Sequence, residues 1–471
     1  MGAVIGFLNT IFWGYVLIYG LLAVGAYFTI RLRFQQILRF PEMFRVIRGS
    51  RGTDRAGISP FQALTISLAS RVGTGNLAGV AVALYLGGPG AIFWMWMVAL
   101  VGMATAYSES TLAQLYKVTD DTGQYRGGPA FYIAKGLHAP WAGMIFSVCL
   151  ILSFGLVFNA VQANSIAEAI EGAFGAPKLV TGLVLATING IIIFGGLRKI
   201  AKVAEYVVPF MAVGYLLLAL YVLVTHLPQV PGVLVSIITN AFGLHEAAGG
   251  VAGGIAAAML NGVKRGLFSN EAGMGSAPNI AACATPDPHH PSSQGFVQAL
   301  GVFIDTLVIC TCTALMILLS GVLEPGSGVS GMQLTQAAMA AHFGFLGKYF
   351  VAIAIFFFAF TSIIGNYSYA ENAVIYLGHG HITGLVALRV AALAMVVWGA
   401  VQTVTTVFDT ADATMGLMAT INLIAIVILS NTVVALTRDY FAQRKAGKEP
   451  AFHASEFPEI TKNVDHSIWT R

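Results

Sequence analysis

Long apolar runs are the feature that most limits what this 471-residue chain can fold into. Hydrophobic residues make up 57% of the sequence, and Asp, Glu, Lys and Arg together only 10%. A soluble domain has about 25% charged residues. Because a soluble surface of this size would need charge to cover it, the missing charge predicts a surface that faces lipid. The sequence therefore predicts an integral membrane protein.

The apolar runs predict helices that span the membrane. A run of about 20 mainly apolar residues can cross the bilayer as a helix, which bonds its own backbone groups where no water is present. About eleven such spans are predicted, at residues 11–30, 60–86, 89–115, 141–170, 178–196, 200–226, 252–283, 294–321, 347–377, 384–401 and 411–437. No Lys or Arg precedes the first run, so we expect it to be a retained helix and not a cleaved signal.

Lys and Arg are concentrated in alternate loops. The segment after the first span contains Arg31, Arg33, Arg39, Arg45, Arg48, Arg51 and Arg55. Six more basic residues follow Leu436, whereas the loops on the opposite side hold almost none. The positive-inside rule then predicts an amino terminus outside and a carboxyl terminus in the cytoplasm. We expect the membrane to be a plasma membrane of the bacterial inner-membrane type.

The sequence gives only general expectations for the segments outside the spans. Residues 31–59 mix Arg with large apolar residues. They fit either an amphipathic helix on the anionic inner leaflet or an ordinary basic connector. The tail 438–471 is polar, and we expect it to be loosely ordered. His289, His290, His379 and His381 fall in predicted cytoplasmic loops, where we expect solvated side chains.

Two spans contain polar, glycine-rich interruptions at mid-membrane depth. Residues 70–76 read SRVGTGN, and residues 269–278 read SNEAGMGSAP. Glycine weakens a helix and Pro278 removes a backbone donor, so each segment predicts a break. Such breaks persist where the freed backbone lines a cavity, and half-helix ends offer N–H groups to a carboxylate and carbonyls to a cation. The alternative is that these glycines only permit close helix packing.

The two interrupted spans lie five spans apart, which predicts an inverted repeat. We divide the chain into an N-terminal helix and basic connector (1–59), a first five-helix repeat with its following loop (60–250), a second repeat (251–437) and a cytoplasmic tail (438–471). The halves show no obvious similarity residue by residue, so the division depends on hydropathy and on the positions of the breaks.

Four motifs resemble the alanine or glycine:cation symporter family. They are VGTGNLAGV at 72–80, YRGGPA at 125–130, KRGLFSNEAG at 264–273 and FIDTLV at 303–308. The resemblance extends from about Phe12 to Thr437. It implies an all-α leucine-transporter fold, with one N-terminal helix before a 5+5 inverted repeat. It also implies alternating access and coupling to sodium or protons.

The resemblance further implies a set of site residues. Substrate contacts are expected from Gly73, Thr74, Gly75, Asn76, Gln162, Phe268, Ser269, Gly273 and Asn366. A sodium site is expected at Ala69, Val72, Thr361 and Ser362, and a second one at Asn76, Ser269 and Asp305. Oxygen ligands suit such a hard ion. The alternatives are that Gln162 bonds a neighbouring helix and that the two hydroxyls bond their own helix.

Charged residues at membrane depth are functional candidates by default. Arg71 and Glu271 lie next to or within the predicted breaks. We expect them to act in gating or in structural pairing more than in direct contact with substrate.

The sequence therefore predicts a symporter that imports alanine and/or glycine with sodium. The alternatives are a proton-coupled amino-acid symporter, or a channel or permease for another small solute. No catalytic constellation is apparent, so we expect no enzyme activity and no cofactor beyond the coupling ion. The expected partners are a small neutral amino acid, sodium and membrane lipid, and no nucleic acid. The coupling ion, the preference between alanine and glycine, and the oligomeric state stay open.

Overall fold

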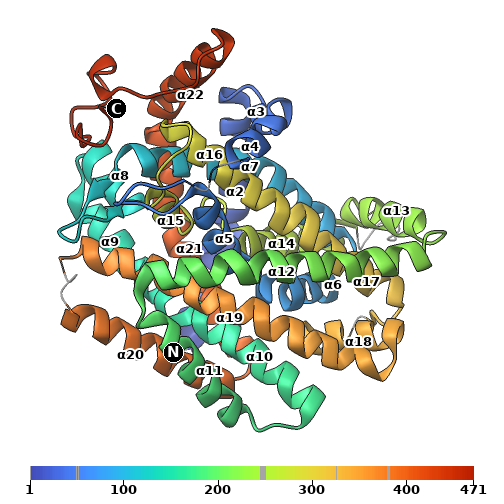
Figure 1. Ribbon diagram of the computed structural model, residues 1–471. Coiled ribbons are helices and arrows are strands. Elements are labelled where there is room, and N and C mark those ends of the chain that lie inside the picture. Colours follow the sequence, from blue (N-terminus) through green and yellow to red (C-terminus); the bar gives the residue numbers. More distant parts are fainter. Residues whose placement is uncertain are drawn as a thin grey trace.

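Helices form nearly all the regular structure of the chain (Figure 1). The computed structural model describes residues 2–48, 50, 52–243, 251–324, 326–378 and 382–470. Within these ranges two short strands, β1 (Val118–Thr119) and β2 (Tyr125–Arg126), pair as an antiparallel hairpin. The boundary predicted at residue 250 between the two repeats lies outside the described residues.

Eight helical segments within those ranges are long and apolar enough to cross a membrane. They are Gly2–Arg31 (α1, η1 and α2), α7 (Gly90–Leu115), Pro140–Phe174 (α9, η3 and α10), α12 (Gly196–Thr225), Pro291–Ser320 (α16, η4 and α17), α19 (Phe345–Tyr376), α20 (Ile382–Val401) and α21 (Val404–Ile428). Three of the eight contain a π-helical turn, namely η1 (Phe12–Val16), η3 (Ile151–Val157) and η4 (Phe303–Cys310). The α-helical parts on either side of these turns are α1 (Gly2–Ile11), α2 (Leu17–Arg31), α9 (Pro140–Leu150), α10 (Phe158–Phe174), α16 (Pro291–Val302) and α17 (Thr311–Ser320).

Two further helices are interrupted where the sequence predicts breaks. The first consists of α5 (Pro60–Arg71) followed by η2 (Gly75–Gly79) and α6 (Val80–Gly87), and the second of α14 (Val251–Asn270) followed by α15 (Pro278–Ala282). We call residues 72–74 the first break and residues 271–277 the second break. The remaining helical elements are α3 (Gln35–Leu38), α4 (Phe40–Ile47), α8 (Pro129–Gly136), α11 (Lys178–Ile193), α13 (Val230–Ala241), α18 (Gly331–Phe343), α22 (Ser430–Lys445) and the short turn η5 (Ala454–Glu456).

Each predicted span contains a helix, although the boundaries of the first and last spans differ from the prediction: the first helical segment begins at Gly2 and not at residue 11. The last span was expected at 411–437, whereas α21 ends at Ile428 and α22 begins at Ser430 as a separate helix. The count of eleven spans and the 5+5 arrangement stay predictions.

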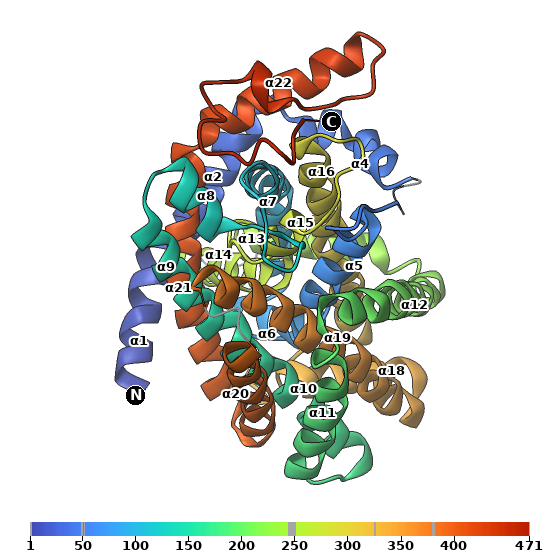
Figure 2. The same ribbon diagram turned by 60° about the vertical axis from the view of Figure 1, so that its left-hand side comes forward.

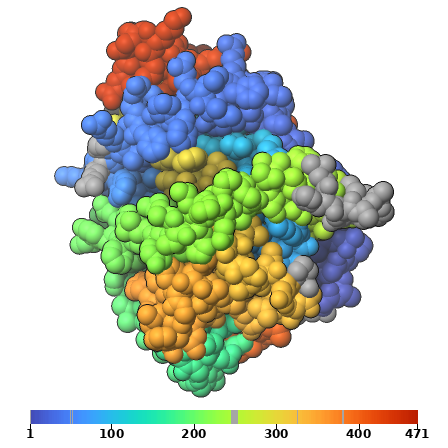
Figure 3. Space-filling view, turned by 90° about the vertical axis from the view of Figure 1, so that its right-hand side faces the viewer, coloured from blue at the N-terminus to red at the C-terminus, as the bar shows by residue number. Residues whose placement is uncertain are grey.

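α7 packs against α14 and α16, and α19 packs against α5 and α10 (Figure 2). Small residues allow the closest of these approaches. A Cβ atom at Gly266 of α14 would lie 2.5 Å from the Val98 side chain of α7, so the two helices approach through a glycine. α12 crosses the outside of this bundle, visible as the green band in Figure 3. The two breaks are thereby enclosed by helices.

The connector after α2 and the C-terminal tail lie together at one end of the molecule, and α1 lies at the other (Figures 1 and 2). We call the end that carries α3, α4 and α22 the basic end. Its arginines would make it the cytoplasmic end under the positive-inside rule. The direction relative to the cell stays a prediction.

The expectation of a loosely ordered tail is wrong. Phe452 and Trp469 are fully buried. The Phe452 N–H donates to the His289 carbonyl at 2.9 Å, and Trp469 Nε1 donates to the Leu115 carbonyl at 3.3 Å. These apolar side chains dock an otherwise polar segment onto the end of α7 and the loop before α16.

The histidine next to that contact is not solvated either. His290 is buried, and its Nε2 lies 3.2 Å from Asp439 Oδ2, on α22. Asp439 and the tail therefore cover the His290 end of this loop, whereas Asp287 in the same loop is exposed. His379 and His381 lie outside the described residues.

Candidate functional site

The first break exposes backbone N–H groups that polar side chains then bind. The Gly73 N–H donates to Asn76 Oδ1 at 2.9 Å, and the Thr74 N–H donates to Gln162 Oε1 of α10 at 2.9 Å. A Cβ atom at Gly73 would overlap the Ser362 hydroxyl and would lie 2.7 Å from Gln162 Oε1. Four predicted substrate residues therefore meet here, and glycine is the residue that fits.

The two interrupted helices touch directly beside the first break. A Cβ atom at Gly75 would lie 3.0 Å from Ser269 Cα and 3.2 Å from the Phe268 ring. Since Ser269 precedes the second break by two residues, this contact places the end of α14 against the start of η2. The predicted residues Gly75, Phe268 and Ser269 are thus neighbours.

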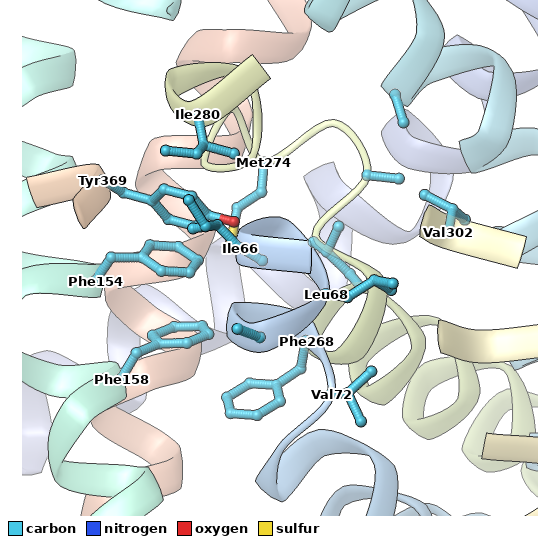
Figure 4. Close-up of a cluster of buried hydrophobic side chains, with 14 of the residues drawn as sticks. Ile66, Leu68, Val72, Phe154, Phe158, Phe268, Met274, Ile280, Val302 and Tyr369 are labelled. Carbon is cyan, nitrogen blue, oxygen red and sulfur yellow. The ribbon is translucent and has the colours of Figure 1, made fainter. Parts of the chain in front are cut away.

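A column of aromatic rings lies beside this contact (Figure 4). Phe268 stacks on Phe158 with centroids 4.7 Å apart, and Phe158 stacks on Phe154 at 4.4 Å. Phe408 of α21 approaches Phe268 at 5.5 Å. Of these rings only Phe268 is predicted from the sequence, because an aromatic residue in an apolar span, such as Phe158 or Phe408, gives no local signal that separates a site role from packing.

A buried ion pair lies next to the aromatic column, on the side toward α1. Arg265 Nη2 lies 2.6 Å from Asp412 Oδ2, and Lys264 Nζ lies 2.7 Å from the same oxygen. The Arg265 guanidinium carbon is 5.1 Å from the centroid of Phe408. This group joins α14 to α21 over the rings, and Asp412 is a further residue that the sequence analysis missed.

Ala69 and Ser362, two of the predicted sodium ligands, are in contact. The Ser362 hydroxyl donates to the Ala69 carbonyl at 2.8 Å, which joins α19 to the last turn of α5. The Ser362 hydroxyl also lies 3.1 Å from the Phe358 carbonyl of its own helix, and the Thr361 hydroxyl donates to that same carbonyl at 2.9 Å without reaching α5. A rotated Ser362 hydroxyl and the Ala69 carbonyl would present two neutral oxygen atoms to a cation. Val72 is buried in the adjoining break.

The second predicted ion set also comes together. Asp305, in the π-helical segment η4, accepts from Asn76 Nδ2 at 2.7 Å, from the Ser269 hydroxyl at 2.8 Å and from the Thr306 hydroxyl at 2.6 Å. All of these side chains are buried. Three donors therefore hydrogen-bond to the buried carboxylate.

Glu271 connects the two interrupted helices. It adopts a left-handed backbone with φ of 59° at the first position of the second break. Its Oε1 accepts from the Ser70 hydroxyl of α5 at 2.7 Å, and its Oε2 accepts from the Ser276 hydroxyl at 2.6 Å. Asn366 lies at the same place, with Oδ1 2.6 Å from the Ser70 hydroxyl. Both carboxylate oxygens are thus engaged within the protein.

Arg71 is buried close to these carboxylates but forms no direct salt bridge with Glu271 among the described residues. Its Nη1 donates to the Gln298 carbonyl at 3.3 Å, while Nε and Nη2 have no hydrogen-bond partner. Its charge acts electrostatically on Glu271 and Asp305. Arg71 therefore balances the buried negative charge around both breaks.

Gly273, predicted to contact substrate, has protein partners for both backbone groups. Its N–H donates to Glu109 Oε1 at 3.1 Å, and its carbonyl accepts from Asn422 Nδ2 at 2.9 Å. The same Asn422 amide lies 2.7 Å from Glu109 Oε2. Glu109 was recognisable from the sequence as an intramembrane carboxylate, whereas its link to Gly273 depends on how α7, α14 and α21 pack.

A second charged network lies toward the basic end. Arg126 Nε lies 2.9 Å from Asp120 Oδ2, and Arg126 Nη2 lies 3.6 Å from Glu371 Oε1 of α19. Arg389 of α20 lies 3.9 Å from Glu371 Oε2. The network ties the β-hairpin to α19 and α20, so charged contacts connect helices on both sides of the breaks.

Comparison with known proteins gives one consistent family. Residues 1–454 match the model of the sodium:alanine symporter family. The probable sodium/glutamine symporter GlnT of Bacillus subtilis strain 168 is 50% identical over 461 residues, which cover 98% of this chain and 94% of that protein. The amino-acid carrier protein AlsT of the same strain is 50% identical over 453 residues, covering 96% and 95%.

Solved structures support the fold. The crystal structure of MhsT in complex with L-phenylalanine superposes with a TM-score of 0.56 at 14% identity, covering 82% of this chain and 99% of that chain. At this identity the likeness is evidence for the fold alone, which is the leucine-transporter fold that the sequence motifs imply.

Proposed function

The chain belongs to the sodium:alanine symporter family, and from this membership we propose that it imports alanine and/or glycine together with sodium. The family consists of transporters and not of enzymes. The chain is accordingly a multi-pass membrane protein that carries an amino acid with a cation. The choice of amino acid, the choice of ion and the direction across a plasma membrane belong to the proposal.

The first break is the observation that carries the proposal. The Gly73 and Thr74 N–H groups are bound by the side-chain oxygens of Asn76 and Gln162, and not by helix carbonyls. A side-chain oxygen can give way to a ligand carboxylate without breaking a helix. The N-terminal end of η2 adds a favourable dipole for the same negative charge.

Crowding around the break supports a small substrate. Ser362 and Gln162 lie against Gly73, and the Phe268 ring and Ser269 lie against Gly75. A substrate held between the two interrupted helices would meet the stacked rings of Phe158 and Phe268 with its side chain. A methyl group or a hydrogen atom requires the smallest displacement of these rings.

Glutamine is a second candidate substrate. The observation that favours it is the 50% identity with a relative named as a probable sodium/glutamine symporter. Binding glutamine would require a polar partner for its side-chain amide and a larger displacement of the aromatic column. Competition between the amino acids separates the two candidates.

Neutral oxygen ligands favour sodium over the proton. Ser362 and Ala69 offer a hydroxyl and a carbonyl from two different helices. The buried carboxylates Asp305 and Glu271 already accept hydrogen bonds from hydroxyl or amide donors. Sodium bound between α5 and α19 would hold the first break against α19, so ion binding would order the substrate site.

Alternating access then requires the two charged networks to open in turn. Arg265 and Asp412 join α14 to α21 on the α1 side, and Arg126 and Glu371 join the hairpin to α19 on the basic side. Opening the first pair would admit substrate and sodium, and opening the second would release them.

The test is uptake of radiolabelled alanine into proteoliposomes. We expect concentrative uptake with an inward sodium gradient and none when an equal proton gradient replaces it. Excess unlabelled glycine should compete, while glutamine should compete weakly. Uptake driven only by protons would contradict sodium coupling. Strong competition by glutamine would identify glutamine, and not alanine or glycine, as the substrate. Protein-free liposomes measure the background uptake.

A further inference from the structure

A cavity of about 870 Å³ lies at the basic end, outside the site described above. It is enclosed by the end of α2, by α3 and α4, and by α22, which lie together in Figure 1. We call it the basic cavity, because seven Arg or Lys side chains line it and Glu42 is its single acidic residue. The positive-inside rule explains basic residues at this end of the molecule but not why they line one cavity.

The positive charge in the basic cavity is mostly unpaired. Glu42 lies 2.7 Å from Arg45 Nη1 and 2.9 Å from Arg444 Nη2, so those two arginines have a partner. Among the described residues, the remaining five basic side chains of the cavity form no salt bridge, although Arg31 donates to Asn431 Oδ1 at 2.7 Å; the five are Arg31, Arg33, Arg39, Arg438 and Lys445. Basic side chains gathered around a cavity repel one another unless an anion binds among them.

A buried side chain in the cavity wall also lacks a partner. Gln35 is 5% exposed, and neither its Oε1 nor its Nε2 has a hydrogen-bond partner. Leaving buried polar atoms unpaired is unfavourable, because they lose their hydrogen bonds to water without gaining others. Gln35 lines the basic cavity, so a ligand there can receive its amide hydrogen bond.

The surface beside the cavity is apolar and exposed. Ile30 is 65% exposed and Phe34 is 47% exposed, next to the cavity residue Leu38 at 69%. Ile30 lies in the last turn of a helical segment long enough to span a membrane, and Phe34 and Leu38 follow that segment. Acyl chains would cover such side chains, and the basic cavity would then lie at the depth of lipid headgroups.

We propose that the basic cavity binds the phosphate headgroup of an anionic phospholipid. Arginine matches a phosphate through paired N–H donors, and several arginines at one site favour a headgroup with more than one negative charge. The adjoining apolar side chains distinguish a lipid from a free anion. The connector 31–59 is then neither a continuous amphipathic helix nor a simple link, but half of a lipid site completed by α22.

The test compares two double variants of the full-length protein in detergent. Arg39→Gln with Lys445→Gln removes two charges from the cavity. Arg48→Gln with Lys448→Gln removes two exposed charges of the same types, outside the cavity and near them in sequence. Native mass spectrometry would measure the binding of cardiolipin, phosphatidylglycerol and phosphatidylcholine, and thermal unfolding would be followed with the same lipids and with inorganic phosphate.

We expect the wild type and the control variant to bind cardiolipin more tightly than phosphatidylcholine. The cavity variant should bind cardiolipin roughly thirtyfold more weakly, because each basic residue near a membrane surface contributes about 1 kcal/mol. Equal weakening in both variants would show that only overall charge matters and would overturn the site. Stabilisation by inorganic phosphate equal to that by cardiolipin would overturn the lipid assignment. If the cavity variant does not fold, cardiolipin binding by the single variant Arg438→Gln, which changes an exposed residue of the cavity, is compared with that of the control variant.

Discussion

The two breaks look alike in sequence but are held in different ways. In the second break, Glu109 and Asn422 bind the Gly273 backbone, and both oxygens of Glu271 accept hydroxyl groups. In the first break, the Gly73 and Thr74 N–H groups meet only the neutral side chains of Asn76 and Gln162. The second break is thus fixed by buried carboxylates, and the first by partners that a ligand can displace.

The difference assigns different roles to the two breaks. Glu109 and Asn422 together hold both backbone groups of Gly273, whereas each free N–H of the first break has a single side-chain partner. The second break therefore serves as a rigid support, with Phe268 and Ser269 just before it. We propose that the first break is the part that responds to substrate and ion. Changes at the second break should reduce stability, and changes at the first should reduce transport.

The largest expected effect is at the anchor of the second break. Glu109→Ala leaves the Gly273 N–H without its buried acceptor and the Asn422 amide with the Gly273 carbonyl as its remaining acceptor, so we expect about 3 kcal/mol of lost stability. Thermal unfolding of the purified protein would measure it. Ser110→Ala is the control, because its buried hydroxyl has no partner. If Glu109→Ala unfolded at the same temperature as the wild type, the second break would not be a support for the fold.

The next effect is on transport through the first break. Gly73→Ala places a methyl group onto the Ser362 hydroxyl and against Gln162. We expect alanine uptake to fall about a hundredfold, because moving a binding group by about 1 Å can reduce a rate by that factor. Thermal unfolding should change little. Gly79→Ala is the matched control, since its nearest atom would be 3.7 Å from the new Cβ. Normal uptake by Gly73→Ala would remove the first break from the site.

A smaller effect is expected on the ion. Ser362→Ala removes the hydroxyl that reaches Ala69, and we expect the sodium concentration for half-maximal uptake to rise about tenfold, equivalent to one ligand worth about 1.4 kcal/mol. Thr361→Val should matter less, because that hydroxyl bonds its own helix. If a variant that combines Ser362→Ala with Thr361→Val kept the sodium dependence of the wild type, these two hydroxyls would have no part in coupling.

The smallest effect is expected from a single hydroxyl at the second break. Ser276→Ala removes one of the donors to Glu271, so stability should fall by about 1 kcal/mol. The half-saturating concentrations of alanine and sodium should match those of the wild type. An altered substrate affinity without lost stability would mean that the second break also binds ligand.

Local chemistry explains which parts of the fold the sequence predicts. Glycines and Pro278 predicted interruptions within 70–76 and 269–278, and the structure has them at residues 72–74 and 271–277. The pairs Ala69–Ser362 and Ser269–Asp305 are also in contact, although their roles stay proposals. The motifs carry this information because short segments determine both the break and its polar residues.

Long-range packing explains what the sequence does not predict. The partners of Gly273, the aromatic neighbours of Phe268 and the ion pair to Asp412 come from helices more than a hundred residues away. Periodicity and spacing contain no signal for such contacts. The docked tail was missed for a related reason, because Phe452 and Trp469 are too few to alter the polar composition of the segment.

Hydrogen–deuterium exchange with and without alanine and sodium tests the comparison most directly. We predict that peptides covering residues 72–76 become strongly protected when both ligands are present, while peptides covering 271–277 stay equally protected throughout. The carboxylate-bound backbone of the second break should already exchange slowly in the absence of ligand. Protection that appeared mainly at 271–277, with no change at 72–76, would contradict the assignment of the first break as the responsive part of the site.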